Sequence, residues 1–322
     1  MSQLKPKQII LHCGLHKTGS TYLQRNFKSK RETLLSHGIL YLGPTTFKKQ
    51  FRYLWKHLQW EKSKKEPSQK LTDLTLKALI QEAGLAPDRI HTIFISFEAI
   101  FGTLRAGLIQ KNRKKNSNRE NKLGLYRYSK RRIKRLMRWL ECTLGTEEID
   151  WTICFASRHR VDFIRSCHIQ LIKEGHEITN LSNEEFMQTS NFSYADPSKL
   201  IDELSSLKKN KKINILPFSY DHNSDRSDPT IYLNNFINLV LPEQAEQIRS
   251  TLISETNSKN LHKNINPGIS ERGLEIARQA RPLFTKQEWK LFRKFFEFVS
   301  LIRVDRMCSA CSGKTRLIKL FR

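Results

Sequence analysis

The chain has 322 residues, 38% of them hydrophobic and 10% aromatic. This composition excludes a chain too polar to fold, and it is enough for one large or two small domains. Lysine and arginine number 57 against 31 for aspartate and glutamate, which gives a formal charge of +26. Such an excess favours an anionic partner such as nucleic acid, anionic lipid or acidic glycan, and a polyanionic cofactor would account for part of it.

No stretch of the sequence approaches the apolar length of a membrane span. The first apolar run, residues 9–11, is short and meets His12, so it is typical of a core strand and not of a signal peptide. We therefore expect a soluble, cytoplasmic protein. Of the six cysteines, Cys308 and Cys311 have metal or redox spacing, but no second pair or histidine is near, and we expect no metal site.

Residues 8–27 are typical of a buried strand, a tight loop and the first turns of a helix. In the loop, Gly14 allows a sharp turn and Gly19 allows close approach of the backbone to a ligand. Ser20 and Thr21 are good residues for a helix start. Free backbone N–H groups, the helix dipole and the charge of Lys17 together predict a site for a phosphate-like anion.

The following segments alternate between helices and strands. We expect a helix over 20–36, a helix over 71–83 stopped by Gly84, and a strand over 91–96. Glu98 follows that strand, so it stands at the sheet edge where ligands bind. Between the helices, residues 43–70 interleave aromatic and basic side chains, which suits stacking on sugars or bases and suits an ordinary amphipathic helix equally well.

Residues 103–135 are strongly basic, and we expect a mobile loop near 111–122 followed by a basic amphipathic helix. Its inner face would consist of Ile133, Leu136, Met137 and Leu140. The outer face is either simply solvated or a docking surface for an anionic acceptor.

A second cluster follows the expected strand at 151–156. Arg158 stands at the strand end and Ser166 lies inside the next helix, near 161–173. A guanidinium offers a planar fork of donors to a phosphate, and a serine hydroxyl offers one more. Further on we expect a strand at 213–218 that ends or lies at an edge because of Pro217. Expected helices complete the chain, at 200–207, 231–240, 270–281 and 285–300.

The loop Gly-Leu-His-Lys-Thr-Gly-Ser-Thr at 14–21 resembles the phosphosulfate loop of sulfotransferases, and the arrangement of Arg158 and Ser166 is similar to their second phosphate site. The likeness covers residues 8–27 and 151–167. The nucleotide-triphosphate pattern Gly-x4-Gly-Lys-Ser/Thr and the dinucleotide fingerprint are both absent. The resemblance implies an α/β fold of the P-loop NTPase-like sulfotransferase type, with a mostly parallel central sheet flanked by helices. Residues 1–302 would form a single domain with a basic insertion at 103–135, followed by a basic tail at 303–322.

The resemblance also implies a reaction, in which 3′-phosphoadenosine 5′-phosphosulfate gives its sulfuryl group to a hydroxyl or amine, without a metal. Gly14 would shape the loop, Lys17 would neutralise the leaving phosphate, and the N–H groups of Thr18, Gly19, Ser20 and Thr21 would bind the 5′-phosphate. Arg158 and Ser166 would bind the 3′-phosphate. Glu98 is the first choice for general base, with His16 and Glu32 in reserve. The acceptor is open, and the aromatic and basic surface favours a saccharide or an anionic glycan.

Two other classes stay open at this point. A nucleotide-dependent kinase on a similar fold would need a Gly-Lys-Ser/Thr loop and an aspartate for magnesium, and the loop is missing. A nucleic-acid-binding protein is suggested by charge alone, without the signature of a known module, so nucleic acid is the less favoured partner. The segment at 257–269, with Lys259, His262 and Lys263, lacks the late Arg-Lys-Gly motif of sulfotransferases and receives no assignment.

Overall fold

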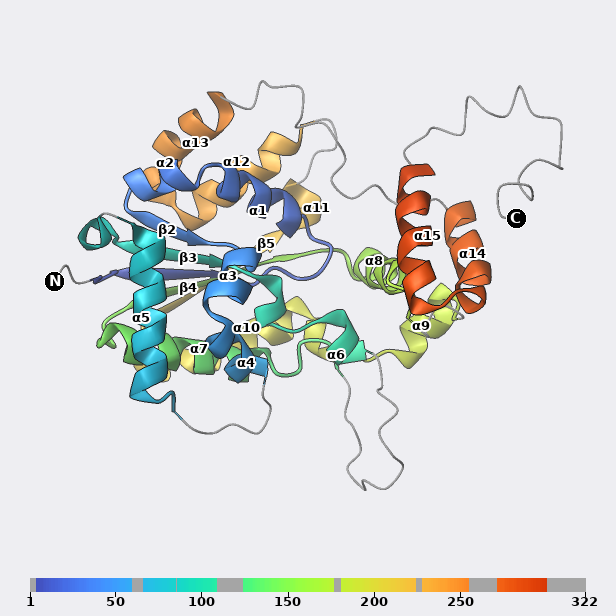
Figure 1. The fold of residues 1–322 in the computed structure, drawn as a ribbon, viewed down its shortest axis with the longest axis horizontal. Helices are drawn as coiled ribbons and strands as arrows, with labels where there is room; N and C mark the ends of the chain where they lie inside the picture. Colours follow the sequence, from blue (N-terminus) through green and yellow to red (C-terminus); the bar gives the residue numbers. More distant parts are fainter. Residues whose placement is uncertain are drawn as a thin grey trace. The chain divides into compact units, whose positions relative to one another are not determined.

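The computed structural model describes residues 4–59, 66–84, 86–108, 124–176, 181–223, 228–254 and 271–299 (Figure 1). The predicted loop at 111–122, the segment at 257–269, both tail cysteines and the tail itself lie outside these residues. The chain divides into two compact units, Met1–Cys167 with Met187–His262, and His168–Phe186 with Lys263–Arg322. The single domain expected over 1–302 stays a prediction.

The first unit is built on a five-stranded, fully parallel sheet in the order β2-β3-β1-β4-β5. The strands are β1 (Gln8–His12), β2 (Ile39–Leu42), β3 (Thr92–Ser96), β4 (Asp150–Ser157) and β5 (Ile213–Ser219). The sheet and its flanking helices confirm the predicted α/β class. β5 pairs with β4 alone, so Pro217 lies on an edge strand as expected. The short apolar strand β2 was not among the predicted elements.

Helices cover both faces of the sheet (Figure 1). On one face, α1 (Ser20–Ser29), α2 (Arg31–Ser36), α12 (Pro229–Val240) and α13 (Ala245–Ser254) enclose a core with the sheet. Its central side chains are aromatic, because Phe27, Phe94 and Phe236 contact one another. The helix predicted over 20–36 is in fact two helices, since Lys30 (φ −111°, ψ 23°) leaves the helical conformation between α1 and α2.

The opposite face carries α5 (Gln69–Ala83), α7 (Ser129–Leu144) and α10 (Pro197–Ser205) (Figure 1). The predicted inner face of the basic helix is confirmed, because its four apolar residues in α7 are all buried. Trp139 of the same helix donates a hydrogen bond to Thr75 of α5 across 3.0 Å. The remaining helices of this unit are α3 (Pro44–Gln50), α4 (Arg52–Gln59), α6 (Leu104–Leu108) and α11 (Tyr220–Asn223).

The second unit is helical. It contains α8 (Arg160–Lys173) from His168 onward, α9 (Asn183–Thr189) as far as Phe186, α14 (Glu271–Ala280) and α15 (Lys286–Val299). Its core gathers around Trp289, which packs with Ile172, Leu274 and Ala277. The Trp289 indole N–H donates to the carbonyl of Lys173 across 3.1 Å.

The topology places a ligand-binding edge at the carboxyl ends of the strands. β1 leads into α1 on one face, whereas β3 leads toward α6 on the other face (Figure 1). Residue His12 at the end of β1 is in register with Ser96 of β3 and Cys154 of β4. Connections that leave neighbouring strands toward opposite faces open a crevice at this edge.

Candidate functional site

The loop after β1, residues 13–19, is the centre of the site. Both of its glycines are required by space. A Cβ on Gly14 would lie 2.5 Å from Ser20 Oγ and 2.9 Å from His12 Nε2. Gly19 has φ 78°, and a Cβ there would lie 2.9 Å from the rings of both Tyr220 and Tyr232. At both positions the backbone of the loop lies so close to neighbouring side chains that only glycine fits.

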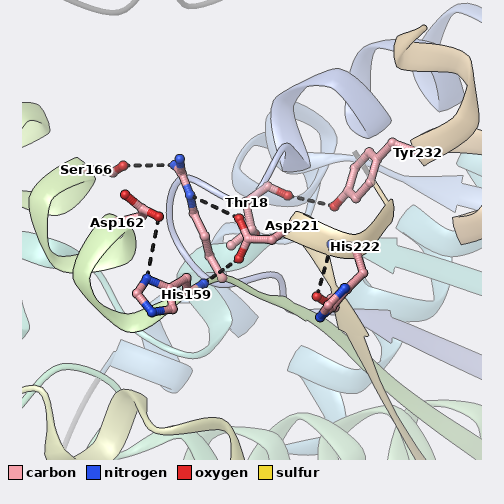
Figure 2. A network of polar contacts seen from close by, with 9 residues as sticks. Thr18, His159, Asp162, Ser166, Asp221, His222 and Tyr232 are labelled. Carbon is pink, nitrogen blue, oxygen red and sulfur yellow. Dashed lines mark hydrogen bonds and ion pairs between the residues drawn. The ribbon is translucent and has the colours of Figure 1, made fainter. Parts of the chain in front are cut away.

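Hydrogen bonds to the backbone fix the course of this loop. Thr18 is buried, and its hydroxyl donates to the Leu15 carbonyl across 2.7 Å. Its own carbonyl accepts from the Tyr232 hydroxyl of α12 across 2.7 Å, as Figure 2 shows. No side chain caps α1 at Gly19, and its first turn contains no acidic residue. The positive end of this helix dipole thus has neither a capping side chain nor an acidic residue of its own first turn, which favours an anion there.

The loop lysine adds a full charge to this end of the helix. Lys17 has a left-handed backbone (φ 65°), which is unusual for a residue with a side chain. Burial raises the pKa of the Cys167 thiol, and both Lys17 and Arg158 oppose that shift. The two cations therefore act on the same buried sulfur and share one electrostatic neighbourhood.

Arg158 follows β4 and is held by side chains from two other elements. Its Nη1 donates to Ser166 Oγ of α8 across 2.9 Å. Its Nε lies 3.7 Å from a carboxylate oxygen of Asp221, which follows β5, and Asp221 also accepts a hydrogen bond from the backbone N–H of His159. Figure 2 shows this network. A guanidinium has five N–H donors, so these two partners leave donors for an anion.

Tyr220 connects the loop with the arginine. Its ring is the neighbour that a Cβ on Gly19 would strike, and the guanidinium carbon of Arg158 lies 5.5 Å from the centre of the same ring. It also packs edge-on against Tyr232, with ring centres 5.3 Å apart. One aromatic side chain thus contacts both halves of the predicted anion site.

Glu98 begins the short 3₁₀ turn Glu98–Ile100 after β3 and is half-buried. Burial raises the pKa of its carboxyl group, and the nearby Ser20 hydroxyl and Gln24 amide oppose the shift. Both groups lie near the carboxyl group, but Ser20 Oγ and Gln24 Nε2 are buried without a hydrogen-bond partner in the described chain. A carboxyl group with a raised pKa beside the loop is suited to accept a proton.

His16 contacts Tyr126 by two hydrogen bonds, through its backbone N–H (2.8 Å) and through ring Nδ1 (2.6 Å). Burial and the charge of Lys17 lower the pKa of His16 to about 4. The imidazole is therefore neutral at physiological pH and senses the charge of Lys17, the next residue of the loop.

A pocket of about 40 Å³ lies beside this arrangement. It is lined by Leu15, Arg158, Arg160, Phe163, Ile164, Phe192, Ala195, Asp196 and Pro197. Leu15 belongs to the loop, so the pocket joins the loop to the arginine. Ligand pockets commonly measure about 300–1,000 Å³, so this pocket alone is too small to enclose a ligand of that class.

The structure brings the sequence-predicted residues of the loop, Glu98, Arg158 and Ser166 to one edge of the sheet, and their roles stay predictions. Glu32 is the exception. It is exposed on α2, which leads into the start of β2, where Ile39 pairs with Thr92 at the beginning of β3. This is the amino end of the sheet, so Glu32 is wrong as a reserve base.

Sequence reasoning missed four residues that shape the site. Tyr220 and Asp221 directly follow a predicted strand, and that position was a usable signal. Tyr232 has the appearance of an ordinary apolar position in a helix. Tyr126 precedes α7 without any local pattern, and only the tertiary structure shows its contact with His16.

The described residues contain no group of three or more His, Cys, Asp or Glu side chains placed to hold a metal ion. Among the same residues, no helix is both long and apolar enough to cross a membrane.

Comparison with protein-family models, curated proteins and solved structures finds no match for this chain.

Proposed function

We propose that this protein is a sulfotransferase that uses 3′-phosphoadenosine 5′-phosphosulfate as sulfuryl donor. The observation that carries the proposal is the convergence of two anion-binding groups at neighbouring strand ends. A glycine-shaped loop with Lys17 opens an uncapped helix after β1, and a hydrogen-bonded Arg158–Ser166 pair follows β4. The Tyr220 ring contacts both. A nucleotide with phosphates at its 5′ and 3′ positions is a ligand that needs two such sites.

The residues divide into donor-binding and reaction groups. The N–H groups of the loop and of the first turn of α1, with Lys17, would bind the 5′-phosphate and stabilise the charge that develops on its oxygen. Arg158 and Ser166 would bind the 3′-phosphate as bidentate and hydroxyl donors.

In the proposed transfer, the acceptor oxygen attacks sulfur and the bond between sulfur and the 5′-phosphate oxygen breaks. The acceptor proton passes to Glu98, and the bond electrons leave with the 5′-phosphate, whose charge Lys17 neutralises. Burial raises the pKa of Glu98, which makes its carboxylate a better proton acceptor near neutral pH. The acceptor is a hydroxyl or amine, and a saccharide fits the aromatic and basic surface.

Calorimetry with 3′-phosphoadenosine 5′-phosphate, compared with ATP and magnesium, tests the proposal. We expect the bisphosphate to bind in the micromolar range and ATP with magnesium to bind at least about tenfold more weakly. Lys17→Ala should abolish measurable binding, whereas Lys28→Ala, an exposed lysine at the far end of α1, should bind as the wild type does. A radiolabelled sulfuryl donor with a panel of saccharides and amines then identifies the acceptor. Preferential binding of ATP with magnesium, or no binding of the bisphosphate, would contradict the assignment.

A further inference from the structure

The described non-glycine residues adopt a positive φ at two positions, Lys17 (φ 65°) and Tyr126 (φ 67°). They are 109 positions apart in sequence and meet through His16, which adjoins one and hydrogen-bonds to the other. Left-handed backbone is costly for a residue with a bulky side chain and persists where surrounding structure enforces it, commonly at functional sites. In the described chain, both non-glycine residues with left-handed backbone thus adjoin or contact His16.

Tyr126 is firmly held in place. Its side chain is 2% exposed, and its ring packs edge-on against Phe101. Its backbone carbonyl accepts the N–H of Ser129 at the start of α7. A Cβ on Gly102 would lie 3.4 Å from the Tyr126 ring, so the tyrosine also fills the space beside that glycine. The phenol is therefore a fixed point to which the loop after β1 is attached.

The Tyr126 oxygen contacts His16 twice. The His16 backbone N–H donates to this oxygen across 2.8 Å, and ring Nδ1 lies 2.6 Å from it. The two rings are stacked, with centres 5.7 Å apart and an interplanar angle of 15°. A single phenol thus fixes both the backbone and the ring of His16.

The positions of the protons follow from counting donors. A phenol oxygen carries one proton, and burial raises the pKa of Tyr126, so that proton stays on. In the described chain Tyr126 Oη has no hydrogen-bond partner besides His16. If Nδ1 carried a proton, two N–H groups would point at Oη and the phenol proton would be left buried without an acceptor, which is unfavourable. The arrangement that satisfies the phenol, Nδ1 and the His16 backbone N–H has the phenol donating to Nδ1, with the imidazole proton on Nε2.

We propose that Tyr126 is a positioning residue that holds His16 in its Nε2–H form, so that His16 donates a hydrogen bond to the anion at the loop and does not act as general base. This inference rests on the proposed function for the identity of the anion. It removes His16 from the reserve bases and leaves Glu98 in that role. The proposal also adds a hydrogen-bond donor, His16 Nε2–H, beside Lys17, whose charge acts on the same imidazole.

Nuclear magnetic resonance of the full chain with ¹⁵N-labelled histidine measures the tautomer directly. The His16 signals are identified by their loss in His16→Gln. We expect a neutral imidazole with its proton on Nε2 throughout pH 5 to 8. A proton on Nδ1, or a charged imidazolium near pH 6, would overturn the inference.

Tyr126→Phe removes the phenol and should turn the single tautomer into a mixture, with an approximately tenfold loss in turnover. Tyr128→Phe is the matched control, because Tyr128 lies two residues away and contacts Arg127 and Arg131 by its ring face. It should leave both the tautomer and the turnover unchanged. An unaltered His16 tautomer in Tyr126→Phe would overturn the positioning role.

Substitutions of His16 test the donor while Tyr126 itself is kept. Glutamine places an amide N–H near the position of Nε2, whereas asparagine places it near Nδ1. Loss of one oxyanion donor costs about 10²- to 10³-fold in turnover, so we expect such a loss for His16→Asn and His16→Ala and a loss of less than about tenfold for His16→Gln. Equal losses in all three would contradict the donor role.

The tautomer measurement is independent of sulfuryl transfer, so the two proposals can fail separately. A protein with Nε2–H His16 that does not bind 3′-phosphoadenosine 5′-phosphate would refute the proposed function and support the positioning role. A protein that binds the bisphosphate with Nδ1–H His16 would refute the positioning role alone.

Discussion

The two halves of the candidate site are built from different parts of the chain. The half after β1 is made of backbone, with glycines at 14 and 19 that admit no side chain and a threonine that bonds to the loop itself. The half after β4 is made of side chains, with Arg158 held between Ser166 and Asp221. Backbone sites are rigid and leave local signals in sequence, whereas side-chain clusters depend on residues brought from distant strands. We therefore expect changes near β1 and β3 to affect turnover and stability as well as donor affinity, and changes near β4 and β5 to affect mainly donor affinity.

The largest expected effect comes from Glu98→Gln, on the β1 and β3 side. The amide keeps the shape of the carboxyl group but cannot accept the acceptor's proton. Loss of a general base costs about 10²- to 10⁴-fold, so turnover should fall by that amount while the dissociation constant of 3′-phosphoadenosine 5′-phosphate stays within about threefold of wild type. Steady-state kinetics beside calorimetry measure both quantities. Full turnover in this variant would move the base elsewhere.

Gly19→Ala should produce the next largest effect, on stability. The substitution combines left-handed strain with contacts of 2.9 Å to two tyrosine rings, and each penalty is about 1–3 kcal/mol. We expect the free energy of unfolding in urea to fall by about 2–4 kcal/mol. Gly145→Ala is the matched control, since φ is 66° there but the space around it is open. If both variants lose the same stability, crowding by the tyrosines is not what fixes the loop.

The pH dependence of stability should separate the halves as well. Burial lowers the pKa of His12 to about 3 and that of His16 to about 4. Because the unfolded chain binds these protons near pH 6.5 and the folded chain does not, both histidines should destabilise the fold as pH falls from 6.5 toward 4. Burial raises the pKa of Glu98, which opposes this trend at the acidic end.

The net loss should reach on the order of a few kcal/mol by pH 4, since one pKa unit corresponds to about 1.4 kcal/mol. Urea unfolding at a series of pH values measures it. His16→Gln should flatten part of the slope between pH 6.5 and 4. An identical slope in this variant would show that His16 titrates normally.

The smallest expected effect belongs to Asp221→Asn, on the β4 and β5 side. The Asp221 carboxylate competes with an incoming anion for Arg158, while asparagine still offers an oxygen to the His159 N–H. The pair is partly exposed, so the stability change should stay below about 1 kcal/mol. Affinity for 3′-phosphoadenosine 5′-phosphate should rise by about two- to fivefold in calorimetry. A loss of affinity would instead make Asp221 a partner of the ligand.

The contrast also explains what the sequence could predict. The strand, loop and helix at 8–27 have strong local patterns. Arg158 directly follows a predicted strand, and Ser166 lies in the predicted helix after it. Both were therefore predicted, as was the buried face of α7. Asp221 comes to the site because β5 pairs with β4, which pairs with β1. Tyr126, just before α7, comes to the site through its tertiary contact with His16. No short window of sequence contains that information.

The most direct test of the central claim is whether one nucleotide contacts both halves. Calorimetry would compare 3′-phosphoadenosine 5′-phosphate with adenosine 5′-phosphate, which lacks the 3′ group, in wild type, Lys17→Ala and Arg158→Ala. We predict that Lys17→Ala weakens both ligands, whereas Arg158→Ala weakens the bisphosphate by about 10- to 100-fold and leaves adenosine 5′-phosphate unchanged. Equal losses for both ligands in Arg158→Ala, or no loss for either, would contradict the account.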